Sequence, residues 1–201
     1  MSTPATHPGP LNPFSTRCTR PGALDYAFPE GTGVETLVAR LEKAGWQGQI
    51  VGPHGTGKST LLAALTPALE RTGRRVVTIT LHDRQRRLPG RLASLVPSGE
   101  PAVLIVDGYE QLGLTSRRRT RRFCARRGVG LIVTAHTSVG LPDLFETTTD
   151  TALARRLVAA LLPPDGPTFS PDEIDAAFAH RQGNVREMLF DLYDVYEQRR
   201  R

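Results

Sequence analysis

Apolar residues along the chain alternate between short runs that are typical of strands and wider spacings that are typical of helices. Between residues 33 and 150, the short runs predict strands at 49–51, 75–81, 102–106, 130–134 and 145–149. Helical spacing predicts helices at 33–44, 59–72 and 115–127, and a partly helical segment at 84–96 that Pro89 and Gly90 interrupt. Strands that alternate with helices in this way indicate a parallel α/β sheet.

The pattern changes at both ends of this region. Residues 1–32 hold many prolines and turn formers, so they predict an extended N-terminal arm, ordered where Phe14, Tyr26 and Phe28 pack. After residue 150 the pattern is wholly helical, with helices expected at 151–162, 171–180 and 184–198. We therefore expect three parts: the arm at 1–32, an α/β domain at 33–150 and a helical lid at 151–201.

Length and composition limit the classes of protein that the chain can belong to. With 201 residues it can build one sizeable core and a small appendage. No apolar run approaches the roughly 20 residues that cross a bilayer, and residues 1–13 lack the apolar segment of a secretory signal. Cys18 and Cys124 lie far apart without metal-like spacing, so we expect no disulfide framework and a cytoplasmic location.

Residues 52–59 read GPHGTGKS and match the phosphate-binding pattern G-x-x-x-x-G-K-[ST]. Glycines allow several backbone N–H groups to point at phosphate oxygens, and the helix that follows turns its positive end toward the anion. Lys58 supplies a cation for the β- and γ-phosphates, and the Ser59 hydroxyl is a ligand for Mg²⁺. The sequence thus predicts an ATP site formed by Gly52, Pro53, His54, Gly55, Thr56, Gly57, Lys58, Ser59 and Thr60.

An acidic residue ends the most apolar of the predicted strands. Residues 102–106 (AVLIV) predict a strand buried on both faces, and Asp107 follows it directly, which is the Walker B form. The carboxyl end of a parallel strand is where open α/β sheets bind ligands. We therefore expect Asp107 to hold Mg²⁺ together with Ser59.

With these two motifs, residues 33–198 resemble the additional-strand (ASCE) class of P-loop NTPases, and most closely small AAA+-like ATPases. The resemblance implies a three-layer α/β/α fold with a mainly parallel sheet and a small C-terminal helical lid. It also implies that the protein binds ATP and Mg²⁺, hydrolyses ATP, and couples the nucleotide state to a conformational change.

The resemblance further implies residues that sense the nucleotide. A polar sensor of the γ-phosphate is expected at the end of the strand at 130–134, where Thr134 and His136 are both candidates. A second sensor is expected in the lid, where Arg186 opens the last helix. In this family the segment before the first helix often passes the adenine, and here residues 12–14 and Tyr26 could do so.

One position departs from the family pattern. AAA+ proteins usually carry a catalytic glutamate directly after the Walker B aspartate, and this chain has Gly108 there. Glu110, three residues after Asp107, is our first candidate for the general base, and Asp83, after the strand at 75–81, is the second. A third alternative is that neither acid serves and hydrolysis is slow.

The helix predicted at 115–127 is strongly basic. It carries seven arginines, which are Arg117, Arg118, Arg119, Arg121, Arg122, Arg126 and Arg127, while Leu112, Leu114, Phe123 and Cys124 are expected to anchor it. Three interpretations stay open. The arginines form a solvated face, or contact phosphates of nucleic acid or an acidic protein, or reach a neighbouring subunit of a homo-oligomer as an arginine finger does.

Two other functions compete with the ATPase. In a small-molecule kinase, the arginines near His82 (Arg84, Arg86, Arg87 and Arg91) would hold an acceptor, although nearly fifty residues precede the loop, unlike in such kinases. In a non-hydrolysing switch or nucleic-acid-binding module, Gly108 would explain the missing glutamate. Dependence of ADP formation on an acceptor separates the kinase from the ATPase.

Overall fold

The computed structural model describes residues 11–200 apart from positions 83, 89, 91, 97 and 98. These residues form two compact units. The sheet unit comprises residues 25–148, and the helical unit comprises residues 11–24 and 149–200. The segment predicted as one extended arm is therefore divided between the two units, and it contains a short helix, α1 (Thr16–Thr19).

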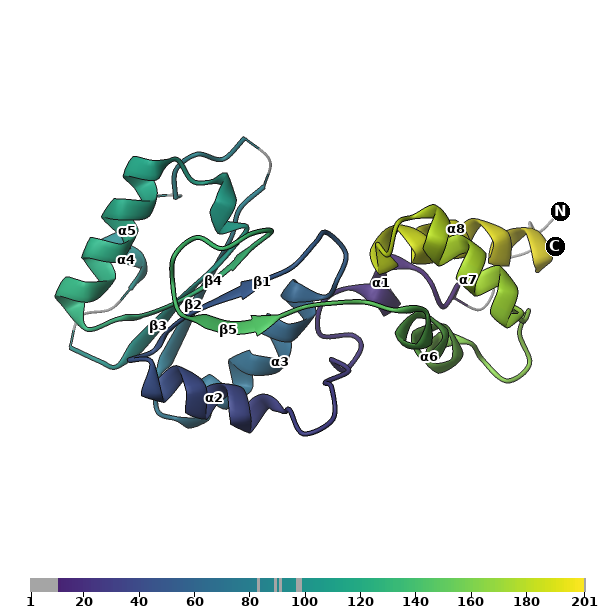
Figure 1. Cartoon of the computed structure of the whole chain (residues 1–201), viewed down its shortest axis with the longest axis horizontal. Helices are drawn as coiled ribbons and strands as arrows, with labels where there is room; N and C mark the ends of the chain where they lie inside the picture. The colour runs from purple at the N-terminus through teal and green to yellow at the C-terminus, as the bar shows by residue number, and fades with distance from the viewer. Residues whose placement is uncertain (1–10, 83, 89, 91, 97–98, 201) are drawn as a thin grey trace, which may run out of the picture. The chain divides into compact units, whose positions relative to one another are not determined.

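The sheet unit is built on five parallel strands (Figure 1). Their order across the sheet is β2-β3-β4-β1-β5. The bounds are β1 (Gln47–Val51), β2 (Arg75–Thr80), β3 (Ala102–Asp107), β4 (Gly130–Ala135) and β5 (Asp143–Glu146). The predicted parallel sheet is thus confirmed, and β4 is the additional strand that separates β1 from β3.

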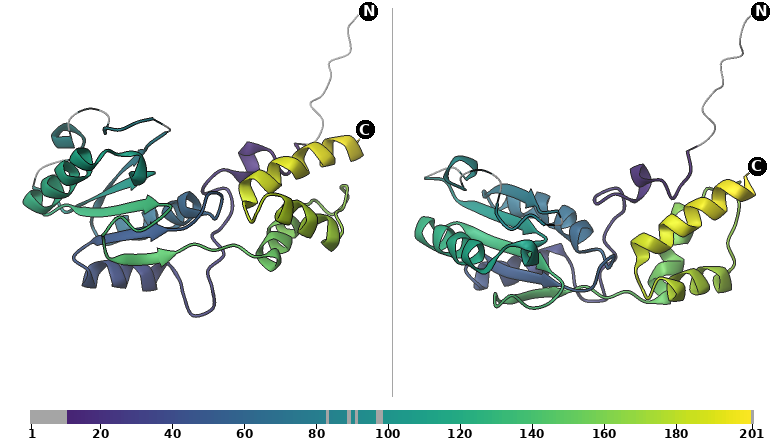
Figure 2. Two further views of the ribbon diagram at one scale, coloured as in Figure 1. Left: turned by 45° about the horizontal axis from the view of Figure 1, so that its top comes forward. Right: turned by 90° about the horizontal axis from the view of Figure 1, so that it is seen from above.

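Helices cover both faces of the sheet, which makes three layers (Figures 1 and 2). On one face, α2 (Val34–Lys43) and α3 (Lys58–Arg71) bury leucines such as Leu37, Leu41 and Leu65 against the strands. On the other face lie α5 (Leu114–Arg127) and the four-residue α4 (Leu92–Leu95). The predicted helical segment at 84–96 is thus reduced to α4, because the chain before it turns at Gly90, whose φ is +68°.

The register of the strands brings their carboxyl ends to one edge of the sheet. Val51 of β1 pairs with Ala135 of β4, and Thr80 of β2 pairs with Asp107 of β3. The five residues of β3 before Asp107 are fully buried, as the sequence predicts for a strand covered on both faces. Side chains that follow β1, β3 and β4 therefore project from a rigid platform toward a common region.

The helical unit consists of α1, α6 (Thr151–Leu161), α7 (Pro171–His180) and α8 (Val185–Arg199). Its three long helices begin at side-chain caps: Asp150 for α6, a Ser170–Glu173 capping box for α7, and Asn184 for α8. Phe14 of the N-terminal segment lies fully buried in the core of these helices, edge-on to Phe169. In the part of the chain that the structure describes, no helix combines the length and apolar character needed to cross a membrane.

Candidate functional site

The loop between β1 and α3 has the backbone that the phosphate-binding pattern predicts. Gly52 has φ +153°, and a Cβ atom there would lie 2.2 Å from the Thr147 hydroxyl oxygen, so no other residue fits. The Thr56 hydroxyl lies 2.6 Å from the hydroxyl of buried Thr147 and 2.9 Å from the Pro53 carbonyl oxygen. These contacts tie the loop to the end of β5. The sequence did not predict this role of Thr147, because a polar residue near the end of a strand is its only distinguishing feature there.

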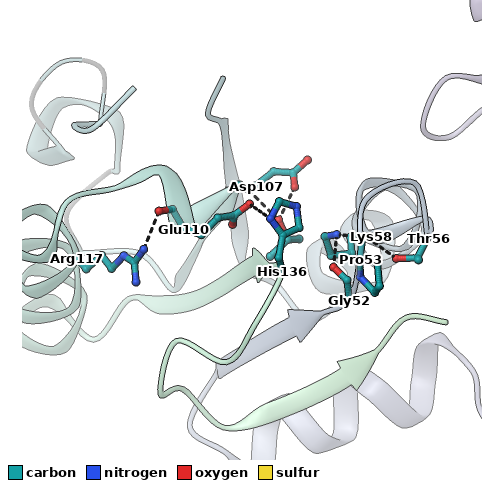
Figure 3. A network of polar contacts seen from close by, with 10 residues as sticks. Gly52, Pro53, Thr56, Lys58, Asp107, Glu110, Arg117 and His136 are labelled. Carbon is teal, nitrogen blue, oxygen red and sulfur yellow. Dashed lines mark hydrogen bonds and ion pairs between the residues drawn. The ribbon is translucent and has the colours of Figure 1, made fainter. Parts of the chain in front are cut away.

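Lys58, the first residue of α3, turns its side chain back toward the loop (Figure 3). Its Nζ donates to the carbonyl oxygens of Gly52 and Pro53, each at 2.6 Å. Burial lowers the pKa of this ammonium group, and the carboxylates of Glu110 and Asp107 oppose that shift. Both acids therefore lie within electrostatic reach of the one lysine of the pattern.

Ser59 and Asp107 meet at the edge of the sheet. The Ser59 hydroxyl donates to Asp107 Oδ2 at 2.7 Å. This separation fits Mg²⁺, which takes hard oxygen ligands at about 2.0–2.1 Å in octahedral geometry, so that adjacent ligands lie about 3 Å apart. Among the described residues, no cluster of three His, Cys, Asp or Glu side chains could hold a metal by itself. A cation here would thus need phosphate or water oxygens to complete its coordination.

Thr134, at the end of β4, uses its hydroxyl within the protein. It donates to Asp107 Oδ1 at 2.5 Å and accepts from the Gly108 N–H at 2.8 Å. Thr134 is only 1% exposed. Of the two candidates for the γ-phosphate sensor, Thr134 therefore orients the Asp107 carboxylate, and it has no free donor to offer a ligand.

The backbone explains why glycine follows the Walker B aspartate. Gly108 has φ +83°, and a Cβ atom there would lie 3.1 Å from the Leu81 carbonyl oxygen. A glutamate at this position would be strained. The chain instead makes one 3₁₀ turn, η1 (Tyr109–Gln111), which carries the acidic side chain at Glu110.

Glu110 and His136 face each other from η1 and from the end of β4. His136 Nδ1 lies 3.2 Å from Glu110 Oε1, while Glu110 Oε2 is buried without a hydrogen-bond partner in the protein (Figure 3). The His136 ring also packs on His54 of the loop, with ring centroids 3.7 Å apart and planes tilted by 51°. A buried carboxylate oxygen with no partner is rare in folded proteins and marks a position where a water or ligand can bind.

Burial lowers the pKa of His136, Glu110 opposes the shift, and His54 and Lys58 add to it. The lowered pKa favours the neutral form of this imidazole. A neutral imidazole beside a carboxylate carries its proton on the nitrogen that faces the acid, which here is Nδ1. His136 thus holds the Glu110 carboxylate by one oxygen, Oε1, and leaves the buried Oε2 without a partner.

The basic helix α5 divides its arginines between structural contacts and solvent. Arg117 donates to the Glu110 carbonyl oxygen at 2.7 Å and to that of Leu112 at 2.9 Å, and Arg121 donates to the Val139 carbonyl. Leu114 is 71% exposed, so its predicted anchoring role is wrong: it lies in the first turn, on the solvent side. Five arginines on this helix are exposed: Arg118, Arg119, Arg122, Arg126 and Arg127.

Of the remaining predicted site residues, some belong to the helical unit and some to the sheet unit. Arg186 belongs to the helical unit, where its guanidinium group lies 5.8 Å from the centre of the Phe190 ring. Asp83 falls outside the described residues. Phe14 is buried within the helical unit, so its ring faces are already packed. Tyr26 lies against the loop, 3.3 Å from where a Cβ atom on Gly57 would be, and burial raises its pKa to about 12.

Comparison with known proteins establishes the fold. No protein-family profile and no curated protein sequence matches the chain. Solved structures do match. A chain of the Drosophila ORC bound to DNA is 16% identical with a TM-score of 0.63, and the match covers 98% of this chain and 65% of that one. Cdc6p of Pyrobaculum aerophilum is 13% identical with a TM-score of 0.62, and the match covers 90% of this chain and 63% of that one. The replication initiator DnaA bound to AMPPCP and single-stranded DNA is 17% identical with a TM-score of 0.54. That match covers 86% of this chain and 63% of the DnaA chain.

At such low identity the similarity concerns the fold alone, and this chain spans less than two thirds of each of these three structures. All three are additional-strand P-loop NTPases of the AAA+ type. The chain therefore has the P-loop NTPase fold that the sequence predicts, and the predicted resemblance to AAA+-like proteins is confirmed at the level of the fold.

Proposed function

We propose that the sheet unit binds ATP with Mg²⁺ and hydrolyses it, and that the nucleotide state changes the conformation of the chain. The observation that carries this proposal is the meeting of Lys58, Ser59 and Asp107 at the carboxyl ends of β1 and β3. Lys58 and the loop N–H groups would hold the β- and γ-phosphates, and Ser59 and Asp107 would hold the metal. A protein of the same fold, DnaA, binds the ATP analogue AMPPCP, which supports the choice of nucleotide.

Hydrolysis would need a base beside the γ-phosphate. Glu110 suits this role because its free Oε2 can accept a proton from water, while neutral His136 holds Oε1. The bound metal would neutralise charge on the β- and γ-phosphates. The Lys58 ammonium would stabilise the charge that develops on the transferred phosphoryl group, and His136 and Arg186 would sense the nucleotide.

Metal dependence tests this proposal directly. We expect ATP to bind the wild-type protein at least about tenfold more tightly with Mg²⁺ than with EDTA, and Asp107→Asn to lose most of that difference. Isothermal titration calorimetry measures both affinities. Asp25→Asn, an exposed acid of the same unit, is the matched control and should behave as wild type. A full Mg²⁺ effect in Asp107→Asn would show that the metal binds elsewhere.

A nucleic-acid partner is the second part of the proposal, and it depends on the exposed face of α5. Arg118, Arg119, Arg122 and Arg126 are exposed, and within the described residues none has an acidic side chain at salt-bridge distance. Uncompensated arginines at this density favour a partner that carries many phosphates. The ORC and DnaA structures, of the same fold, contain DNA, which supports this choice over an acidic protein or a subunit contact.

Salt dependence tests the arginine face. For a labelled single-stranded oligonucleotide, we expect the double variant Arg118→Gln/Arg122→Gln to reduce the slope of log K against log salt by about 1.4, because each phosphate contact contributes about 0.7. Fluorescence anisotropy at several salt concentrations measures the slope. The control Arg40→Gln/Arg71→Gln removes two exposed charges on α2 and α3 and should leave the slope unchanged. Equal losses in both double variants would contradict a specific role of α5.

Other predictions complete this picture. A homo-oligomer with α5 at the subunit contact, and a cytoplasmic location, stay predictions. A small-molecule kinase is the alternative function, and ADP formation that depends strictly on an added nucleoside would favour it over the ATPase. Tight ATP binding with no phosphate release would favour a non-hydrolysing switch.

A further inference from the structure

A recess lies on the sheet unit beside Glu110, and Glu110 is the one residue of its lining that the proposed nucleotide chemistry uses. It is a cavity of about 500 Å³ lined by two segments of the chain. The segment after β2 contributes Arg84 and Arg86, and η1 with the turn into α5 contributes Glu110, Gln111, Leu112 and Gly113. Glu110 therefore borders both this cavity and the site that contains Lys58.

Hydrogen bonds hold the two walls of the cavity together. The Arg86 carbonyl oxygen accepts from the Gly113 N–H at 3.2 Å and from the Ser116 hydroxyl at 3.0 Å. Arg117 fixes the other wall, since it donates to the carbonyl oxygen of Glu110 (Figure 3) and to that of Leu112. A cavity whose walls are already ordered binds a ligand without the entropy cost of assembling the site.

The charges of the cavity favour an anion. Among the residues that the structure describes, neither Arg84 nor Arg86 has a carboxylate within ion-pair distance. The one acid of the lining, Glu110, is already engaged by His136 through Oε1. Two guanidinium groups that have no ion-pair partner in the described part of the chain suit a phosphate group, whose oxygens accept their paired N–H donors in a planar fork.

The backbone at Arg84 points to the same conclusion. Arg84 has φ +71°, a left-handed conformation that glycine or asparagine adopts far more readily than arginine. Such strain clusters at ligand-binding positions, where the side chain is needed in spite of its backbone cost. An arginine at this position has an evident use if its guanidinium group binds a ligand in the cavity.

We propose that this cavity binds a phosphate ester through Arg84 and Arg86, and that the bound ligand alters ATP turnover through Glu110. The phosphate belongs either to a small phosphorylated molecule or to the backbone of a nucleic-acid strand. Binding itself is independent of the ATPase, whereas the effect on turnover rests on the function proposed above. A ligand at Arg84 and Arg86 adds negative charge near Glu110 and changes the field at its free Oε2.

Binding is measured by calorimetry on the full chain saturated with AMPPCP, so that the phosphate-binding loop is already filled. The probes are glycerol 3-phosphate, with glycerol as its uncharged counterpart, and a short oligothymidylate. We expect at least one phosphate probe to bind, and Arg84→Gln and Arg86→Gln each to weaken it about tenfold. Arg40→Gln, an exposed arginine on α2, is the matched control and should bind as wild type.

The probes distinguish the sources of the phosphate. Binding of glycerol 3-phosphate that depends on Arg84 and Arg86 identifies a small phosphorylated ligand, and such binding of the oligonucleotide alone identifies a strand. The inference is overturned if neither probe binds at millimolar concentration, or if Arg40→Gln weakens binding as much as the cavity variants. Thermal melting of each variant checks that it is folded. The same titration on Lys58→Ala without nucleotide tests the cavity in a protein whose ATP site is impaired, so a failure of the cavity can be told apart from a failure of the ATP site.

The effect on turnover is tested with the probe that binds. We expect it to change the rate of ATP hydrolysis at least about twofold in wild type and to have no effect in Arg86→Gln at the same concentration. A probe that binds through Arg84 and Arg86 but leaves the rate unchanged overturns the coupling to Glu110 and leaves the binding site standing.

Discussion

Replacing Lys58 with alanine is expected to lower the affinity for ATP by at least about 100-fold and to abolish hydrolysis. A charge-assisted hydrogen bond contributes about 1.5–3 kcal/mol, and the half-buried ammonium would make more than one of them to the β- and γ-phosphates. No second cation of the loop can replace it, because residues 52–60 contain no other lysine or arginine.

Calorimetry with Mg²⁺-ATP and a phosphate-release assay measure these two effects. The chain offers one matched control, since Lys43 is the only other lysine and lies exposed at the end of α2. Lys43→Ala should bind and hydrolyse ATP as wild type does. Because Lys58 donates to two loop carbonyls, a thermal melt must show that Lys58→Ala is folded. A folded Lys58→Ala protein with unchanged affinity would remove the basis of the proposed function.

Replacing Glu110 with glutamine should slow ATP hydrolysis by about 100-fold or more while the dissociation constant for ATP changes by less than about threefold. General-base catalysis contributes roughly 10²–10⁴ in rate, and glutamine keeps the size of the side chain and its hydrogen-bonding contact with His136 but cannot accept the proton. A loss confined to the rate constant separates the general base from residues that bind the nucleotide.

Asp83→Asn is the decisive comparison for this prediction. Single-turnover rates and Mg²⁺-ATP affinities are measured for Glu110→Gln and Asp83→Asn. The general base is the residue whose replacement by an amide abolishes the chemical step but not ATP binding. If Asp83→Asn loses the activity and Glu110→Gln keeps it, the assignment of Glu110 is wrong. Equal, near-zero phosphate release from wild type and from both variants, with tight ATP binding, would instead identify a non-hydrolysing switch.

Local chemistry explains why much of the sheet unit was predictable. The loop at 52–59 is recognisable because only certain residues can adopt its backbone, as the Gly52 conformation and its closeness to Thr147 illustrate. β3 was predictable because a strand buried on both faces requires apolar residues at every position, and 102–106 has them. Asp107 then follows at the carboxyl end of that strand, where parallel sheets expose their ligand-binding edge.

Other parts of the site depend on contacts between segments that are distant in sequence. The sequence left Thr134 and His136 as equal candidates, and the packing of β4 beside β3 separates them, since Thr134 bonds to Asp107 and His136 faces Glu110. Thr147 belongs to no sequence motif, and its role is evident only from the structure, where it follows β5 and its hydroxyl contacts that of Thr56. The seven arginines of α5 look alike in sequence, whereas the fold uses Arg117 to hold η1.

The sequence by itself therefore determined the strand and helix order, the phosphate-binding loop and the acid at the end of β3, because these depend on local conformation and on burial patterns with a short period. Tertiary structure alone decided which polar groups pair, why glycine occupies position 108, and that Arg84 and Arg86 border the same cavity as Glu110. Pairing depends on distances between segments far apart along the chain, and a pattern of residue types does not encode those distances.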